Sequence, residues 1–187
     1  MLARMNRKYT VKEYIDLVDK IKKVINFQFS IFNFQCPISI TTDIIVGFPG
    51  ETKKDFNETK SLFNKIKFDM AYIARYSPRP GTAAYRLNDN VSKDEKKRRD
   101  EELNAILRKT ALENNKKYIG QVVKVLIEYK NKKGEWVGRI ESNKVVMLKV
   151  ESEKLKVKNL IGNFIIAKIN KVSDFGLEGN MLKKIPN

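Results

Sequence analysis

ITTDIIVGFPGET, at residues 40–52, contains a strand, a glycine-rich turn and a helix start in direct succession. Residues 44–46 form a short β-branched run, which is typical of a parallel strand buried on both faces. Gly47 and Gly50 then end the strand, because glycine tolerates backbone angles that other residues avoid. Residues 53–66 follow with apolar side chains at helical spacing. The stretch predicts an α/β unit with a ligand-binding loop after the strand; a plain strand-to-helix connection is the alternative.

The composition is strongly basic and nearly devoid of metal-binding side chains. The 187 residues carry 38 Lys and Arg against 22 Asp and Glu, a formal net charge of +16. Such a charge favours a polyanionic partner, nucleic acid before an anionic membrane, although a lysine-rich genome would produce the same count. With one cysteine, Cys36, and no histidine, the chain cannot form an internal disulfide, a Cys/His zinc site or a cluster held by its own three or four cysteines.

Apolar runs are too short for a membrane span, and the N-terminus lacks the apolar core of a signal peptide. We therefore expect a cytoplasmic protein with no membrane partner.

A second rigid loop follows the next predicted strand, residues 70–76. Its sequence, SPRPGT at residues 77–82, holds Arg79 between two prolines. A fixed arginine at the C-terminal end of a barrel strand suits a carboxylate or a phosphate. Without further context, it would be an ordinary surface arginine in a turn.

Two helices with capping boxes flank this unit. Thr10 and Glu13 begin the first, and Ser92 and Glu95 begin a long, very basic helix over residues 91–118. The expected apolar stripe of the first helix consists of Tyr14, Leu17, Val18, Ile21 and Ile25.

A phenylalanine-rich segment, residues 27–36, separates the first helix from the central strand. Alternation of Phe27, Phe29 and Ile31 suits an extra strand. Nothing in the sequence indicates what this segment does.

From residue 118 onward the pattern changes to a period of two. Strands are expected at residues 122–127, 136–140, 145–150, 164–169 and 176–179. Short strands at regular spacing predict a small five-stranded barrel.

Three motif groups resemble those of the radical S-adenosylmethionine (SAM) tRNA methylthiotransferases. GFPGE at residues 47–51 resembles the family's turn at the SAM pocket, and YSPRPGT at residues 76–82 resembles its signature loop. GEWVGR, NKVV and LEG, at residues 134–139, 143–146 and 177–179, resemble the family's TRAM domain, an OB-like RNA-binding barrel. The fold implied is α/β plus all-β: the C-terminal part of a radical SAM (β/α) barrel over residues 1–90, a connecting helix over 91–117 and a TRAM barrel over 118–183.

The resemblance also implies roles for individual residues. Those expected on the SAM side are Asp43, Gly47, Glu51 and Arg79, and those expected to contact RNA are Trp136, Arg139, Lys144 and Lys149. A core position for Trp136 is equally consistent with its strand. No catalytic residue is identified.

Family enzymes use SAM and two [4Fe-4S] clusters, but the two cysteine triplets that hold those clusters have no counterpart here. The resemblance therefore covers only the C-terminal portion of the family. We expect no SAM cleavage by this chain alone, and a separate chain supplying the missing half is one arrangement that would restore it.

The implied function is methylthiolation of tRNA at C2 of N6-isopentenyladenosine beside the anticodon. AYIAR at residues 71–75 lacks the histidine-containing strand of the enzymes acting on threonylcarbamoyladenosine, which are one alternative. A non-catalytic RNA-binding protein that uses the TRAM barrel and the basic helix is the other. The sequence indicates no oligomeric state.

Overall fold

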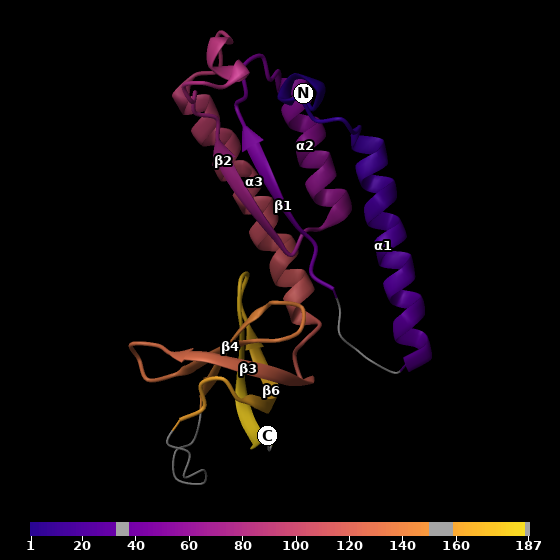
Figure 1. Cartoon of the computed structure of the whole chain (residues 1–187), viewed down its shortest axis with the longest axis vertical. Helices are drawn as coiled ribbons and strands as arrows, with labels where there is room; N and C mark the ends of the chain where they lie inside the picture. The colour runs from indigo at the N-terminus through magenta and orange to yellow at the C-terminus, as the bar shows by residue number, and fades with distance from the viewer. Residues whose placement is uncertain (33–37, 150–158, 186–187) are drawn as a thin grey trace. The chain divides into compact units, whose positions relative to one another are not determined.

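The structure, a computed structural model, describes residues 1–32, 38–149 and 159–185 (Figure 1). The chain forms two compact units. The first comprises Met1–Gln35 and Ile40–Thr110, and the second comprises Cys36–Ser39 and Ala111–Asn187. Helix α3 (Lys93–Lys116) contributes residues to both units.

The first unit is built on a parallel pair of strands with a helix between them. Its elements are η1 (Ala3–Met5), α1 (Val11–Phe32), β1 (Thr41–Val46), α2 (Lys53–Ile66), β2 (Met70–Arg75), η2 (Ala83–Arg86) and most of α3. β1 pairs with β2 in parallel, from Thr41 opposite Met70 to Val46 opposite Arg75. The core that covers this pair comes from both strands and all three α-helices and contains Val18, Val46, Phe56, Phe63, Ile66, Phe68, Ala71, Leu103 and Leu107.

Local sequence signals account for the helix starts. The predicted capping box of α1 is confirmed, because Thr10 N donates to Glu13 Oε2 at 2.7 Å and Glu13 N donates to Thr10 Oγ1 at 3.2 Å. Thr52 and Asp55 form a second complete box at α2. At α3, Glu95 N donates to Ser92 Oγ at 3.2 Å, but the Glu95 carboxylate binds two arginines further along the helix.

Three expectations for the first unit are wrong. β1 is covered on one face only: Ile45 is 43% exposed, and Tyr72 on β2 is 64% exposed, because the core packs against the opposite face.

The expected apolar stripe of α1 is also wrong in part. Leu17 and Ile21 are exposed, and the face that packs against the core consists of Tyr14, Ile15 and Val18.

The third correction concerns the phenylalanine-rich segment. Residues 27–32 continue α1 rather than forming a strand. No glycine or proline interrupts the helix before Phe32, so hydrogen bonding along the helix prevails over the alternating pattern. Residues 33–36 lie outside the described ranges.

The second unit contains a closed barrel of five strands, as the sequence predicts. The strands are β3 (Val122–Lys130), β4 (Trp136–Arg139), β5 (Val145–Lys149), β6 (Phe164–Val172) and β7 (Leu177–Lys184), in the order β3-β4-β5-β7-β6. All neighbours are antiparallel except β5 and β7, which run parallel. Val150, expected to end the third strand, is outside the described residues. The barrel core consists of Tyr118, Val125, Ile127, Ile140, Val146, Leu148, Leu160, Ile165, Ala167, Ile169 and Leu177.

None of the helices in residues 1–32, 38–149 and 159–185 combines the length and the apolar character that a membrane span needs.

Barrel closure requires the backbones of β3 and β4 to approach closely at Gly138. A Cβ atom on Gly138 would collide with the carbonyl oxygen of Leu126, an atom that the strand ladder holds in place. Gly176 differs, since its added Cβ would lie 3.3 Å from Ser173 Oγ and its φ is not positive.

We expect Gly138→Ala to destabilise the barrel by about 2–3 kcal/mol, because the collision involves backbone that cannot rotate away. Urea unfolding monitored by the fluorescence of Trp136, the chain's single tryptophan, measures this loss. Gly176→Ala is the matched control, with an expected change below about 1 kcal/mol. Equal unfolding midpoints for the two variants would contradict the close-approach argument.

Candidate functional site

The turn after β1 has the geometry that its sequence predicts. Gly47 and Gly50 have φ values of 70° and 79°, in the left-handed region. Glu51 N donates to Phe48 O at 2.8 Å and closes a four-residue turn with Pro49 second and Gly50 third, the arrangement typical of a type II turn. Gly47 is also sterically required, since a Cβ atom there would strike the buried stem of the Lys96 side chain. At Gly50 an added Cβ atom would meet only the exposed Arg4 guanidinium, which can move aside, so the positive φ is what favours glycine there.

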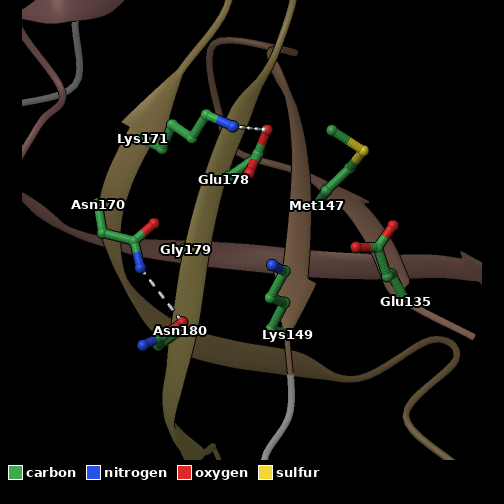
Figure 2. Close-up of a pocket in the computed structure, with 8 residues that line it drawn as sticks. All are labelled: Glu135, Met147, Lys149, Asn170, Lys171, Glu178, Gly179 and Asn180. Carbon is green, nitrogen blue, oxygen red and sulfur yellow. Dashed lines mark hydrogen bonds and ion pairs between the residues drawn. The ribbon is translucent and has the colours of Figure 1, made fainter.

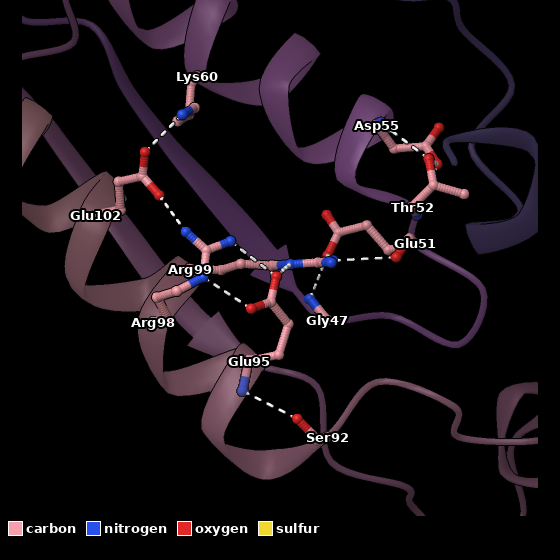
Figure 3. A network of polar contacts seen from close by, with 10 residues as sticks. All are labelled: Gly47, Glu51, Thr52, Asp55, Lys60, Ser92, Glu95, Arg98, Arg99 and Glu102. Carbon is pink, nitrogen blue, oxygen red and sulfur yellow. Dashed lines mark hydrogen bonds and ion pairs between the residues drawn. The ribbon is translucent and has the colours of Figure 1, made fainter.

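Glu51 holds this turn in place from inside the unit. Its carboxylate accepts hydrogen bonds from Gly47 N at 2.5 Å and from Arg99 Nη1 at 2.6 Å (Figure 3). Arg99 Nη1 also donates to Glu51 O at 3.1 Å. The side chains are only 4% and 5% exposed, so Glu51 and Arg99 form a buried, charge-assisted pair.

A chain of ion pairs extends from Arg99 along α3. Arg99 Nε donates to Glu95 Oε1 at 2.8 Å, and Arg98 bridges Glu95 and Glu102 (Figure 3). Hydrogen bonds from Arg98, and then from Arg99, lower the pKa of Glu95 from 4.5 to about 2. Lys60 Nζ donates to Glu102 Oε1 at 2.5 Å, and this bond lowers the pKa of Glu102.

The loops that follow β1 and β2 meet at one edge of the sheet. Tyr76 N donates to Val46 O at 2.8 Å, which extends the parallel pairing beyond the strands. The rings of Phe48 and Tyr76 pack edge to face with centroids 5.1 Å apart. The two motifs of the first unit, residues 47–51 and 76–82, are therefore in contact.

The four residues expected on the SAM side occupy different environments. Gly47 and Glu51 are joined by the hydrogen bond described above and are buried. Asp43 is exposed on the open face of the sheet, opposite Tyr72. Arg79 is also exposed, and its backbone carbonyl accepts a hydrogen bond from Thr82 Oγ1 at 2.8 Å.

Sequence reasoning missed two residues that shape the turn, Lys96 and Arg99. Lys96 is buried over Gly47, and its Nζ donates to Asp89 Oδ2 at 2.6 Å and to Tyr76 O at 3.3 Å. A signal was present: positions 96 and 99 continue the buried helical stripe of Leu103 and Leu107 by one turn. A lysine or arginine at a buried position of a helical stripe predicts that an acceptor for its charge, such as a carboxylate, lies nearby.

The four residues expected to contact RNA occupy different environments on the barrel. Trp136 pairs with Leu148 and packs against the core, with Lys130 Nζ 5.1 Å from its ring centroid. Arg139 Nε lies 3.2 Å from Glu128 Oε2, and its Nη1 donates to Asn143 O at 3.0 Å. Lys144 Nζ lies 5.9 Å from the ring centroid of the buried Tyr118.

The fourth residue, Lys149, lines a shallow outer groove of about 290 Å³ over β5, β6 and β7 (Figure 2). Glu135 and Glu178 line the same groove, and Lys171 Nζ lies 3.6 Å from Glu178 Oε1. These carboxylates offset much of the positive charge there, so the groove is poorly suited to a polyanion.

The donor set of the chain does not fit an iron–sulfur cluster. Clusters in proteins are held mainly by cysteine thiolates, and this chain has one cysteine and no histidine. Among the described residues, no group of three or more His, Cys, Asp or Glu side chains is placed to hold a metal ion.

Comparison with known families agrees with the fold. Residues 116–182 match the model of the TRAM domain, and this range contains nearly all of the closed barrel. A wider similarity, which includes the barrel and extends over almost the whole chain, is to tRNA-2-methylthio-N(6)-dimethylallyladenosine synthases. The chain is 39% identical over 185 residues to that of Acetivibrio thermocellus, 40% over 183 to that of Geobacillus thermodenitrificans and 40% over 181 to that of Clostridium tetani.

These matches cover 98%, 97% and 96% of this chain but 35%, 32% and 36% of the three relatives. The chain thus spans about a third of the length of the curated relatives it matches. It corresponds to their C-terminal part.

We expect Arg99→Met to destabilise the first unit by about 3–5 kcal/mol, because it leaves the Glu51 carboxylate buried without its cation. Loss of helical circular dichroism during urea unfolding measures this change, whereas Trp136 fluorescence follows the barrel separately. Lys97→Met removes an exposed cation from the same helix and should change stability by less than about 0.5 kcal/mol. Similar losses for both variants would mean that the buried pair has no special role.

Acid should weaken the first unit through the same ion-pair chain. The pKa of Glu95 is lower in the folded state than in the unfolded chain. The ionised Glu95 carboxylate therefore stabilises the first unit fully above pH 4.5, and this stabilisation is lost as pH falls toward about 2. We expect Glu95→Gln to lower the stability of the first unit by about 1–2 kcal/mol at pH 7, since solvent screens a side chain that is 30% exposed. Near pH 2, close to the folded-state pKa of Glu95, the same substitution should cost almost nothing, because much of the carboxylate is then protonated. Urea midpoints across this range test it. Glu101→Gln, an exposed control on α3, should leave the pH dependence unchanged.

Proposed function

We propose that this chain takes part in tRNA modification, as the C-terminal part of a methylthiotransferase acting on N6-isopentenyladenosine beside the anticodon. The observation that carries the proposal is the similarity itself, about 39% identity that runs through both units. A TRAM barrel alone would support RNA binding but would not account for the similarity of the first unit. A tRNA substrate would place the protein in the cytoplasm.

In this proposal the first unit supplies one wall of the SAM pocket. Support comes from the contact between its two motif loops through Phe48 and Tyr76, at the edge where a parallel sheet binds ligands. Gly47 and Glu51 maintain the shape of that wall, since their polar groups bond to each other. Asp43 and Arg79, both exposed, are the side chains available to a ligand.

The bound SAM would supply the methyl group of the product. We assign no cluster chemistry to these 187 residues, because their donor set does not fit a cluster. The cluster ligands of the complete enzyme would come from polypeptide outside this sequence, in the same chain or in a partner.

A second candidate function is RNA binding without catalysis. The barrel favours it, because its strand ladder is closed and its core is complete within the second unit. This candidate predicts binding that does not respond to SAM.

Titration of the chain with the anticodon stem-loop of a tRNA, with and without SAM, tests both candidates. We expect affinity to fall steeply between about 50 and about 200 mM salt, because bound lysines displace counterions from phosphates. Tighter binding in the presence of SAM supports the methylthiotransferase proposal, and binding indifferent to SAM supports the second candidate. The same stem-loop with and without the N6-isopentenyl group is the matched control for the nucleoside. Absence of binding at the lower salt concentration would overturn both candidates.

A further inference from the structure

The outer surface of β3, β6 and β7 carries lysines in a regular arrangement. Lys124 of β3 lies opposite Ile166 of β6, which lies opposite Lys183 of β7. In the next row, Val122 lies opposite Lys168. Neighbouring strands are about 4.8 Å apart, so the strand register alone places Lys124 and Lys183 within about 10 Å of each other on one face.

We refer to Val122, Lys124, Phe164, Ile166, Lys168 and Lys183 as the β3–β6–β7 face. All three of its lysines are exposed. None forms an ion pair with a carboxylate of the described residues, and residues 122–126, 164–168 and 180–184 contain no Asp or Glu. Within the described ranges, no carboxylate offsets the positive charge of this face, unlike that of the groove around Lys149.

The same face presents an aromatic ring to solvent. Phe164 is 42% exposed, and Lys124 Nζ lies 4.1 Å from its ring centroid. Across the ladder Phe164 pairs with Leu126, which supports one side of the side chain. An exposed ring beside a cation is the combination that proteins use to stack a base while binding the adjacent phosphate.

The chemistry of the face favours nucleic acid over a protein partner. Its apolar side chains on β6, Phe164 and Ile166, lie between Lys124 of β3 and Lys183 of β7. Lysine is depleted in the cores of protein–protein interfaces, whereas lysines around an aromatic ring are typical of surfaces that bind single strands.

We propose that the β3–β6–β7 face binds a single-stranded segment of RNA, with Lys124, Lys168 and Lys183 against phosphates and Phe164 stacked on a base. This inference rests on the RNA binding included in the proposed function. It moves the contact from Trp136, which packs against the barrel core, to the outer surface. There the strand register places Arg139 within about 10 Å of Phe164, and Lys149 within about 10 Å of Lys168.

Two triple variants with equal loss of charge test the location. Lys124→Gln, Lys168→Gln and Lys183→Gln remove the lysines of the face. Lys130→Gln, Lys132→Gln and Lys133→Gln remove three exposed lysines at the end of β3 and in the turn before β4. The affinity of the whole chain for a fluorescently labelled single-stranded RNA of about 16 nucleotides is measured by fluorescence anisotropy at several salt concentrations. We expect the first triple to lower the slope of log affinity against log salt by about 2 and the control triple to change it by less than about 1.

Phe164→Leu separates stacking from charge. We expect it to weaken binding about tenfold with an unchanged salt slope, because a leucine cannot stack on a base. Thermal unfolding followed by Trp136 fluorescence checks that each variant remains folded. Acetylation of lysines in the unmodified chain, with and without RNA, gives a readout that needs no variant: RNA should protect Lys124, Lys168 and Lys183.

Each outcome decides a specific question. Equal losses in both triples, or protection spread over all lysines, would overturn the proposed face and indicate binding by overall charge. Loss confined to the control triple would move the site to the turn between β3 and β4 and leave the proposed function intact. If the unmodified chain does not bind RNA at low salt, the proposed function fails together with the inference.

Discussion

The buried pair of Glu51 and Arg99 is the contact on which the order of the first unit depends. It joins the end of β1, the glycine-rich turn and α3, and 48 positions separate its two residues in the sequence. Neither charge can remain buried alone at low cost, so the turn adopts its shape only when α3 packs in register. Lys96 lies one helical turn before Arg99 and packs over Gly47, so it also fixes the alignment of α3 with the turn. A motif that looks local in the sequence is thus held by a helix that follows much later.

The two units differ in how many of their strand edges are hydrogen-bonded to another strand of the same unit. The barrel pairs every strand on both sides and surrounds a complete core. Among the described residues of the first unit, the two strands pair only with each other and leave Ile45 and Tyr72 exposed on an uncovered face. Unpaired strand edges and exposed apolar faces favour association with other polypeptide. The barrel is therefore the better candidate for independent stability.

Local sequence patterns predict the positions of helices and strands better than they predict the contacts between residues far apart in the sequence. The five barrel strands could be located because alternation and turn residues report on a few neighbouring positions, and the capping box at Thr10 is likewise local. The extension of α1 through Phe32 was missed because alternating phenylalanines fit a strand as well as a helix. Arg99 was missed because its role depends on a distant carboxylate. The outer β3–β6–β7 face depends on strand register, which the sequence of one strand does not contain.

The position of β7 also constrains how the protein is made. β7 lies between β5 and β6, although it follows both in the chain. Until it arrives, both of those strands present an open edge, so the barrel cannot close while the ribosome still holds residues 177–184. Folding of this unit therefore waits until β7 has left the ribosome. A premature stop before Leu177 would release a chain with two unpaired strand edges rather than a smaller folded domain.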